Sequence, residues 1–210
     1  MSTAVLRKKQ TVIGPDANGT MMTHEEFDRA EFEDGWRYEL INGVLIVSPI
    51  PSEKEADPNE ELGYWLRRYK EEHPKGKALD KTLQERIVKT GKNRRRADRV
   101  IWAGLGRLPR KDEAPTIIAE FVSKGKQNRQ RDYETKRDEY LKIRVQEYWI
   151  IDRFDRCMVV FSRQGNQVKR RVIAENQVYK TPLLPGFEVV VAKLLKLADE
   201  WGDSEQTTED

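Results

Sequence analysis

Two carboxylates stand inside apolar segments that lie close together in the sequence: Asp98 in ADRVIW and Glu120 in TIIAEFVSK. The second segment is short and rich in β-branched residues, which is typical of a strand buried on both faces. Alternation along that strand places Glu120 on the same face as Ile118 and Val122. Because an isolated buried charge costs on the order of several kcal/mol, each carboxylate must be paired or bound to a metal.

If the two strands are neighbours, Asp98 and Glu120 can bind one divalent cation. Mg²⁺ and Mn²⁺ prefer oxygen ligands, usually a few carboxylates together with water and substrate phosphate. Glu39 in YELIN is a third strand carboxylate, which could be a further ligand or could face solvent. The alternative is that Asp98 and Glu120 form ion pairs with arginines such as Arg96 or Arg99, because ion pairs perturb carboxylates as metals do.

Lys136 is a cation that could complete such a site. On a helix it lies three residues after Tyr133 and four before Tyr140, on the face that we expect to point inward. It could extend its amine to solvent, which is the common outcome for a lysine on such a face. It could instead reach the metal, orient a water molecule and stabilise negative charge that develops on a phosphate.

A basic run, KNRRR, directly precedes the segment that contains Asp98, and its charged members are Lys92, Arg94, Arg95 and Arg96. Basic turns are often only solvated, but beside metal-binding carboxylates they could contact the phosphates of a nucleic acid. The sequence contains no HExxH, CxxC or GxSxG motif, no phosphate-binding glycine loop and no dinucleotide-binding motif. Metal-assisted chemistry is therefore the best supported of the reactions considered.

The bulk composition sets further limits. The 210 residues contain Lys+Arg 39 against Asp+Glu 36, and the resulting net charge of +3 does not by itself argue for nucleic acid. The single cysteine, Cys157, excludes a disulfide framework, and its apolar surroundings predict a buried, unreactive thiol. We expect a cytoplasmic protein, because no segment is long enough for a transmembrane helix and the N-terminus lacks a signal-peptide pattern.

Helix and strand signals alternate irregularly, which predicts one α/β domain with a central mixed β-sheet flanked by helices. Asn42-Gly43 between two apolar runs predicts an N-terminal β-hairpin over 38–41 and 44–47. Asp57-Pro58 predicts the start of a helix that ends near Pro74. The other expected elements are a capped helix from Thr23, strands over 83–88, 97–102, 116–123 and 146–152, a helix over 131–144, a hairpin over 156–174, and a final strand and helix over 185–198.

The two ends of the chain differ in composition from the middle. Residues 1–20 mix small, basic and turn-forming residues without a period, which predicts a flexible N-terminal arm. Residues 199–210 include DSEQTTED, which predicts an acidic C-terminal tail. The folded domain is therefore expected over residues 21–198.

Four segments in this order, RYELINGVLI, ADRVIW, IIAEFVS and DYETKRDEYLKIRVQEYWIID, resemble a bacterial restriction-endonuclease family of the PD-(D/E)XK nuclease superfamily. The resemblance covers roughly residues 20–195. It implies a restriction-endonuclease-like core, a magnesium-dependent phosphodiesterase site, DNA as the partner and a homodimer. Asp98 matches the motif aspartate, Glu120 the motif glutamate and Glu39 the acidic residue that the family carries early in the chain.

The sequence departs from this family pattern in two places. Ala97 precedes Asp98 where the motif has proline, and this matters little because proline is not a ligand. Val122 occupies the position of the motif lysine. Lys124 lies roughly 13 Å along the strand from Glu120, at about 3.3 Å per residue, which is far for a lysine to reach back. Lys136 is therefore the better substitute, and Lys124 is the reserve.

These residues lead to the hypothesis of a metal-dependent nuclease that hydrolyses phosphodiester bonds, with DNA as the expected substrate. Asp98 and Glu120 would bind Mg²⁺ or Mn²⁺ with help from Glu39, and Lys136 would act on the water or the transition state. The basic run and Lys124 would contact the nucleic-acid backbone. Two alternatives stay open: a catalytically inactive nucleic-acid-binding module on the same fold, favoured by Val122, and a structural or interaction protein, favoured by the balanced charge.

Overall fold

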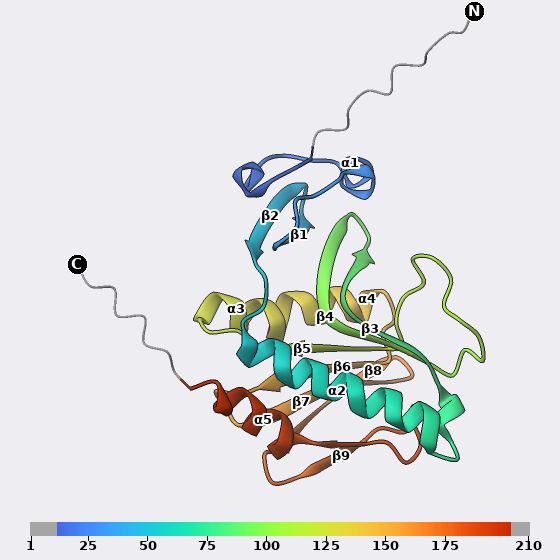
Figure 1. Cartoon of the computed structure of the whole chain (residues 1–210). Helices are drawn as coiled ribbons and strands as arrows, with labels where there is room; N and C mark the ends of the chain where they lie inside the picture. Colours follow the sequence, from blue (N-terminus) through green and yellow to red (C-terminus); the bar gives the residue numbers. More distant parts are fainter. Residues whose placement is uncertain (1–11, 203–210) are drawn as a thin grey trace, which may run out of the picture.

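An eight-stranded mixed sheet forms the centre of the protein in this computed structural model, which describes residues 12–202 (Figure 1). The strand order is β2-β1-β4-β5-β6-β7-β8, and β3 pairs with β4. Only the β5–β6 pair within this sheet is parallel, so the predicted mixed sheet is confirmed. The strands are β1 (Trp36–Ile41), β2 (Val44–Pro49), β3 (Leu79–Thr90), β4 (Asn93–Ala103), β5 (Ile117–Phe121), β6 (Glu147–Asp152), β7 (Cys157–Gln164) and β8 (Gln167–Ala174).

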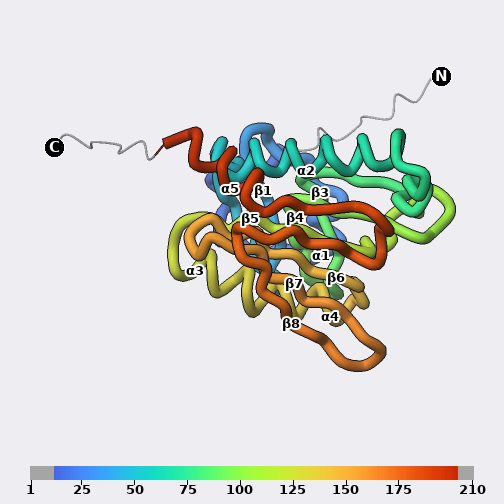
Figure 2. Tube along the Cα trace, turned by 90° about the horizontal axis from the view of Figure 1, so that it is seen from below, coloured from blue at the N-terminus to red at the C-terminus, as the bar shows by residue number. Residues whose placement is uncertain are grey.

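Helices cover both faces of this sheet (Figure 2). One face is covered by α2 (Glu53–Glu72) and α5 (Val191–Glu200), together with the small β9–β10 sheet (Val178–Lys180 and Glu188–Val190). The other face is covered by the continuous helical segment α3 (Lys126–Gln130), η3 (Arg131–Lys136) and α4 (Arg137–Lys142), of which η3 is a π-helix. No helix within residues 12–202 is long and apolar enough to cross a membrane.

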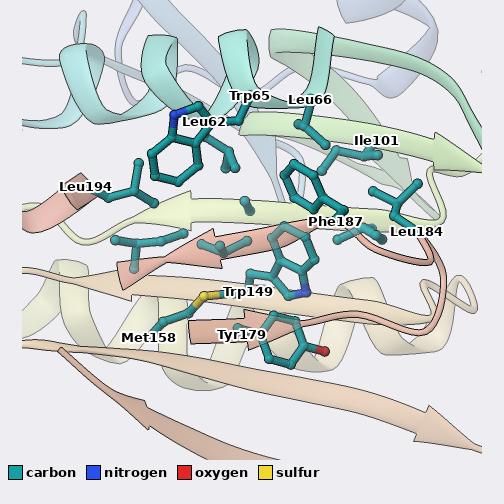
Figure 3. Close-up of a cluster of buried hydrophobic side chains, with 14 of the residues drawn as sticks. Leu62, Trp65, Leu66, Ile101, Trp149, Met158, Tyr179, Leu184, Phe187 and Leu194 are labelled. Carbon is teal, nitrogen blue, oxygen red and sulfur yellow. The ribbon is translucent and has the colours of Figure 1, made fainter. Parts of the chain in front are cut away.

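The alternation predicted for β5 is confirmed by the two buried clusters on either side of the strand. Ile117, Ala119 and Phe121 belong to the cluster under α2 and α5. Ile118 and Val122 belong to the cluster under α4. In the first cluster Leu62, Leu66 and Leu194 from the helices meet Trp149 and Met158 from the sheet (Figure 3). The sheet is thus covered on both sides at β5, which explains why this strand contains so few polar residues.

The N-terminal hairpin forms as predicted from Asn42-Gly43. Asn42 and Gly43 connect β1 to β2 with φ angles of 51° and 80°. A tight turn of this kind needs positive φ at both central residues, and asparagine and glycine tolerate that conformation better than other residues do. Leu40 of β1 then pairs with Arg94 of β4, which attaches the hairpin to the central sheet.

The N-cap of helix α2 lies five residues before the predicted N-cap, Asp57. Ser52 is the N-cap, and it forms a capping box with Glu55: its backbone N–H donates to Glu55 Oε2 at 3.0 Å. Pro58, which we placed at the first helical position, lies inside the helix. Both segments carry N-terminal signals, and the earlier capping box satisfies the free backbone donors first. The predicted end is confirmed, because the helix stops before Pro74.

Residues 12–20 do not form the loose arm that we expected. The backbone N–H of Gly19 donates to the carbonyl of Leu45, and the N–H of Leu45 donates back to the carbonyl of Thr20, each at 2.8 Å. Asn18 Oδ1 also accepts from the N–H of Val47 at 2.9 Å. This segment is therefore hydrogen-bonded to β2 of the hairpin. The rest of the expected arm, residues 1–11, and residues 203–210 of the expected tail lie outside the described part of the chain.

The remaining predicted elements form with shifted boundaries. The α1 helix (His24–Arg29) has the predicted capping box between Thr23 and Glu26. The helix expected over 131–144 begins earlier, at Lys126, and contains the π-helical turn. Cys157 is buried at the start of β7, and burial raises the pKa of its thiol, in agreement with an unreactive cysteine.

Candidate metal centre

Strands β4 and β5 bring Asp98 and Glu120 together. The strands pair antiparallel with Arg99 opposite Ala119 and Val100 opposite Ile118, and the next step of this register places Asp98 opposite Glu120. Directly opposed residues of an antiparallel pair project from the same face of the sheet. The helical segment that meets these carboxylates is η3 and α4, and Asp98 is 5% and Glu120 1% exposed.

Glu120 is held by two side chains from the helical segment above it. Lys136 Nζ donates to Glu120 Oε2 at 2.8 Å, and the Tyr140 hydroxyl donates to Oε1 at 2.9 Å. Lys136 is itself 3% exposed and lies 3.7 Å from Asp132. The prediction that Lys136 points inward is therefore confirmed, and its amine does not extend to solvent.

The π-helical turn Arg131–Lys136 supplies two of these charged groups, Asp132 and Lys136. A π turn is a wider turn that is rare in proteins and is often found at functional sites. Asp132 and Lys136 are four residues apart and both point toward the sheet. The Tyr148 hydroxyl of β6 donates to the Asp132 carbonyl at 3.0 Å, which fixes the turn against the sheet.

Asp98 is also paired, although not with the arginines that we considered. Arg37 Nη2 of β1 donates to Asp98 Oδ1 at 2.6 Å, and the Phe121 backbone N–H donates to Oδ2 at 2.8 Å. Arg37 Nε also lies 3.1 Å from Glu85 of β3. Of the two arginines named in the alternative, Arg99 donates to Asn59 on the opposite face of the sheet.

Burial and neighbouring charges push the pKa values of the two carboxyl groups apart. Burial raises the pKa of Glu120 to about 8, with Lys136 opposing and Asp98 adding to this shift. Burial would also raise the pKa of Asp98, but the positive charges of Arg37 and Lys136 outweigh it and hold that pKa below its usual value. For Lys136 the negative charges of Glu120 and Asp132 outweigh burial, so its pKa is raised. Glu120 therefore holds a proton to higher pH than Asp98 does.

The structure does not bring Glu39 into one group with Asp98 and Glu120. Glu39 is buried, and its Oε1 accepts the backbone N–H of Arg96 at 2.8 Å. Within residues 12–202 no three histidine, cysteine or acidic side chains are arranged to hold a metal. Lys124, the reserve lysine, is exposed beyond the end of β5, whereas Lys136 contacts Glu120 directly.

The basic run has two kinds of members. Arg94 donates to Asp28 from Nε at 2.6 Å, and Arg95 donates to Glu139 from Nη2 at 2.6 Å. Both arginines are 3% exposed, so these charges are used inside the protein rather than presented to phosphate as we expected. Lys92 is exposed at the β3–β4 turn, and the Arg96 side chain is half-buried, with Nη1 donating to the Glu85 carbonyl at 3.1 Å.

Two carboxylates in register on adjacent strands fit the ligand set of a magnesium or manganese ion. Such ions commonly take one or two protein carboxylates and fill their other positions with water and substrate oxygen. Asp98 and Glu120 would have to exchange their present contacts with Arg37 and Lys136 for the cation. Both contacts are made by side chains of elements other than β4 and β5, namely β1 and η3, so the exchange itself breaks no β4–β5 pairing.

The protein-family comparison matches residues 24–195 to the Uma2 family, described as "Putative restriction endonuclease". The chain belongs to this family. No curated protein matches the chain. A crystal structure from Anabaena variabilis ATCC 29413, described as "a putative nuclease belonging to DUF820", superposes with a TM-score of 0.66 over 84% of this chain and 99% of that chain, at 15% sequence identity. This likeness shows the fold, and the predicted restriction-endonuclease-like core is confirmed.

Sequence reasoning missed three side chains around the two carboxylates of this Uma2 protein: Arg37, Asp132 and Glu85. Asp132 could have been found, because it precedes Lys136 by four residues on the same helical face. Arg37 shares a strand face with Glu39, but its pairing with Asp98 spans 61 residues and has no local signal. Glu85 has a positive φ of 49°, which is unusual for a glutamate and which no local sequence motif predicts.

Proposed function

We propose that this Uma2-family protein is a metal-dependent nuclease that hydrolyses phosphodiester bonds in DNA. The observation that supports the proposal most is the buried group of Asp98, Glu120 and Lys136 on one face of the sheet. Two carboxylates and a lysine are the polar parts that a PD-(D/E)XK site needs, and Lys136 supplies the amine that Val122 cannot. The family match and the shared fold support a nuclease independently of these contacts.

In this proposal Asp98 and Glu120 bind Mg²⁺ or Mn²⁺. A bound divalent ion would lower the pKa of a coordinated water and neutralise charge on the scissile phosphate. Lys136 Nζ would orient the attacking water and stabilise negative charge on the phosphate oxygens, because the amine lies within hydrogen-bonding distance of Glu120 and keeps its proton. The Tyr140 hydroxyl would keep the Glu120 carboxylate in place through its hydrogen bond to Oε1.

Other side chains would act at the edge of this site. Glu39 would act on the site through its negative charge, since it contributes to the raised pKa of Lys136. Lys92 and Lys124 are exposed, and we propose them as backbone contacts for DNA. The homodimer implied by the family resemblance is part of the same proposal, and light scattering on the purified protein would test it.

A second function, a nucleic-acid-binding module without activity, is favoured by one observation. Both carboxylates are already neutralised from within the chain, Asp98 by Arg37 and Glu120 by Lys136. A site that kept these pairs in the presence of metal would bind DNA in a salt-sensitive way and release no product. Metal binding therefore separates the two functions.

The first experiment is calorimetric titration of Mn²⁺ into the wild type and into Glu120→Ala, with and without a short DNA duplex. The nuclease proposal predicts binding near millimolar or tighter that disappears in the variant. Cleavage of linear and plasmid DNA would then be measured with Mn²⁺ and with EDTA. Asp98→Ala, Glu120→Ala and Lys136→Met are each expected to lower the cleavage rate by at least about a hundredfold.

Glu147→Gln is the matched control for these variants. Glu147 is a buried carboxylate on the neighbouring strand β6, but it accepts the Trp149 indole N–H at 2.8 Å, and Trp149 belongs to the cluster under α2 and α5. Glutamine can accept the same hydrogen bond, so metal binding and cleavage should stay at the wild-type level. Metal-dependent cleavage that survives in both Asp98→Ala and Glu120→Ala would refute the proposal.

A further inference from the structure

A cavity of about 700 Å³ opens beside the candidate metal centre, between α1, strand β3 and the loop formed by residues 104–116. The loop runs next to the β3–β4 hairpin in Figure 1. Pockets of about 300–1,000 Å³ are the usual size for small ligands, and a nucleotide unit fits within this range. None of the hydrogen-bond partners described above for Asp98 and Glu120 lines this cavity.

The acidic and the basic side chains that line this cavity differ in whether they already form salt bridges. The acidic ones already have partners: Asp28 and Asp112 pair with Lys89, and Glu113 pairs with Arg107. The fourth acid, Glu85, pairs with Arg37. By contrast, no salt bridge within residues 12–202 involves the side chains of these lining residues: Lys81, Arg86, Arg110 and Lys111. The charge left to a ligand is therefore positive.

Apolar side chains form the rest of the lining. Trp102 and Val100 of β4 are buried, and the Trp102 indole N–H donates to the Glu113 carbonyl, which ties the loop to the sheet. Leu108 of the loop and Leu83 of β3 also line the cavity, and they are 69% and 36% exposed. An exposed apolar surface with cations around it suits a flat ring that carries a phosphate.

The cavity and the candidate metal centre share a wall. Glu85 and Arg96 line the cavity, and Lys136 Nζ donates to the Arg96 carbonyl at 3.3 Å. Glu85 Oε1 and Arg96 Nε are buried without a hydrogen-bond partner in the described part of the chain. The wall between the cavity and the metal centre therefore contains two charged side chains whose hydrogen bonding is incomplete.

We propose that this cavity binds one nucleotide unit of the substrate strand, with the base against Leu83 and Leu108 and the flanking phosphates on Arg86, Arg110 and Lys111. This inference rests on the proposed function for its substrate class, and it adds a position for the strand next to the cleavage site. The base leaves the duplex stack or belongs to a single strand, because a paired base cannot enter a pocket.

The test measures binding rather than cleavage. Fluorescence anisotropy with a labelled twelve-nucleotide single strand, in EDTA, gives the affinity of the wild type and of the Arg110→Ala/Lys111→Ala double variant across a range of KCl concentrations. The variant is expected to bind about tenfold more weakly at 100 mM KCl, and its salt slope should fall by about 1.4, at about 0.7 for each phosphate contact in a single strand.

Lys169→Ala/Arg170→Ala is the matched control, because these two basic residues are also adjacent, exposed and free of salt bridges in the described chain, but lie on the distant strand β8. Its affinity should stay within about twofold of the wild type. Equal weakening by both double variants, or a wild type that binds no strand at 100 mM KCl, would refute the inference.

A second arm tests whether a base enters the cavity. A strand with one central abasic sugar should bind wild type about fivefold more weakly than the intact strand, since it loses the apolar contact of one base with Leu83 and Leu108. The same abasic sugar should have a smaller effect on Leu108→Ala, which lacks part of the surface. An equal effect on both proteins would exclude the base from the cavity, and displacement by a free mononucleotide at micromolar concentration would show that the ligand is not a strand.

Failure of this inference and failure of the nuclease proposal look different. If the cavity variant binds like wild type while Asp98→Ala abolishes cleavage, the nuclease stands and the cavity assignment is wrong. If the cavity variant loses binding but the wild type cleaves no nucleic acid with any divalent metal, the cavity assignment stands and the nuclease proposal is wrong.

Discussion

The buried charges on the two faces of strand β4 have different kinds of partner. Arg99 points toward α2, where its Nε and Nη2 donate to the side-chain and backbone oxygens of Asn59, each at 2.7 Å. Its neighbour Asp98 points toward α3 and α4, where its side-chain partner is Arg37 and the next carboxylate is Glu120. Neutral oxygens on a helix satisfy the first charge, whereas the Arg37 guanidinium and the Phe121 backbone N–H satisfy the second, beside the titratable Glu120.

This difference shows what makes a buried charge a candidate for function. Burial is equally deep on both faces, so burial alone does not distinguish Arg99 from Asp98. The groups themselves distinguish them, because the Asp98 carboxylate can exchange Arg37 for a metal cation, whereas the Arg99 guanidinium has no acceptor oxygen and cannot bind one. The α2–α5 face is therefore expected to behave as a structural core and the α3–α4 face as a pH-dependent site.

The largest expected effect is on the structural face. Leu66→Ala removes a fully buried side chain between α2 and the sheet, and it should lower the free energy of unfolding by about 3 kcal/mol (range about 2–5). Urea unfolding followed by circular dichroism measures this. Tyr64→Ala on the exposed side of the same helix is the control and should stay within about 0.5 kcal/mol. The difference for Leu66→Ala should be the same at pH 5 and pH 8, because no titratable group is removed.

A second prediction separates a buried member of the basic run, Arg95, from an exposed one, Lys92. Glu139 accepts from Arg95, Thr90 and Asn93, which makes the Arg95–Glu139 pair part of a fixed network. Arg95→Met should lower the free energy of unfolding by about 2 kcal/mol, because it leaves Glu139 without its cation. Lys92→Ala at the exposed turn should have no measurable effect on stability. Equal stability of the two variants would mean that Arg95 is not structural.

The third prediction concerns the pH dependence that Glu120 gives to stability. Its pKa is about 8 in the folded protein and near 4.5 when unfolded, so between these values the folded state binds the extra proton. Stability should therefore fall as pH rises from 5 to 8, by at most about 1.4 kcal/mol per pH unit from this group. Glu120→Gln should remove this slope. Parallel pH profiles of the wild type and Glu120→Gln in denaturant titrations would contradict the raised pKa.

Much of this arrangement was predictable from local sequence patterns. The alternation in β5 fixed which face carries Glu120, and the helical spacing of Tyr133, Lys136 and Tyr140 predicted that Lys136 points inward. These predictions depend only on the 2.0 and 3.6 periods of strand and helix. The hairpin was equally local, because the turn conformation selects Asn-Gly.

The partners of the charged residues were not predictable in the same way. Asp98 pairs with Arg37 across 61 residues, and Arg94 pairs with Asp28 across 66. The basic run KNRRR looked like a phosphate contact because sequence shows its charge but not the distant acids that use it. The start of α2 was missed for a different reason: two competing N-terminal signals occur within six residues, and the capping box of Ser52 and Glu55 is the one that forms.

The smallest expected effect compares one hydroxyl on each face. Tyr140 donates to the titratable Glu120 Oε1 at 2.9 Å, whereas Tyr69 donates to the carbonyls of Lys75 and Pro185 at 2.9 and 3.1 Å. Tyr140→Phe and Tyr69→Phe should each lower the free energy of unfolding by about 1 kcal/mol at pH 6, since each removes one hydroxyl and leaves the ring in place.

Above pH 8 the two variants should diverge, because hydrogen bonds to a charged acceptor contribute about 1.5–3 kcal/mol and those to a neutral one about 0.5–1.5. The cost of Tyr140→Phe should rise as Glu120 ionises, and that of Tyr69→Phe should stay constant. Denaturant unfolding of both variants at pH 6 and pH 9 measures the difference. If the two costs rise together, the pH response belongs to the whole fold, and the contrast between the two faces of β4 does not hold.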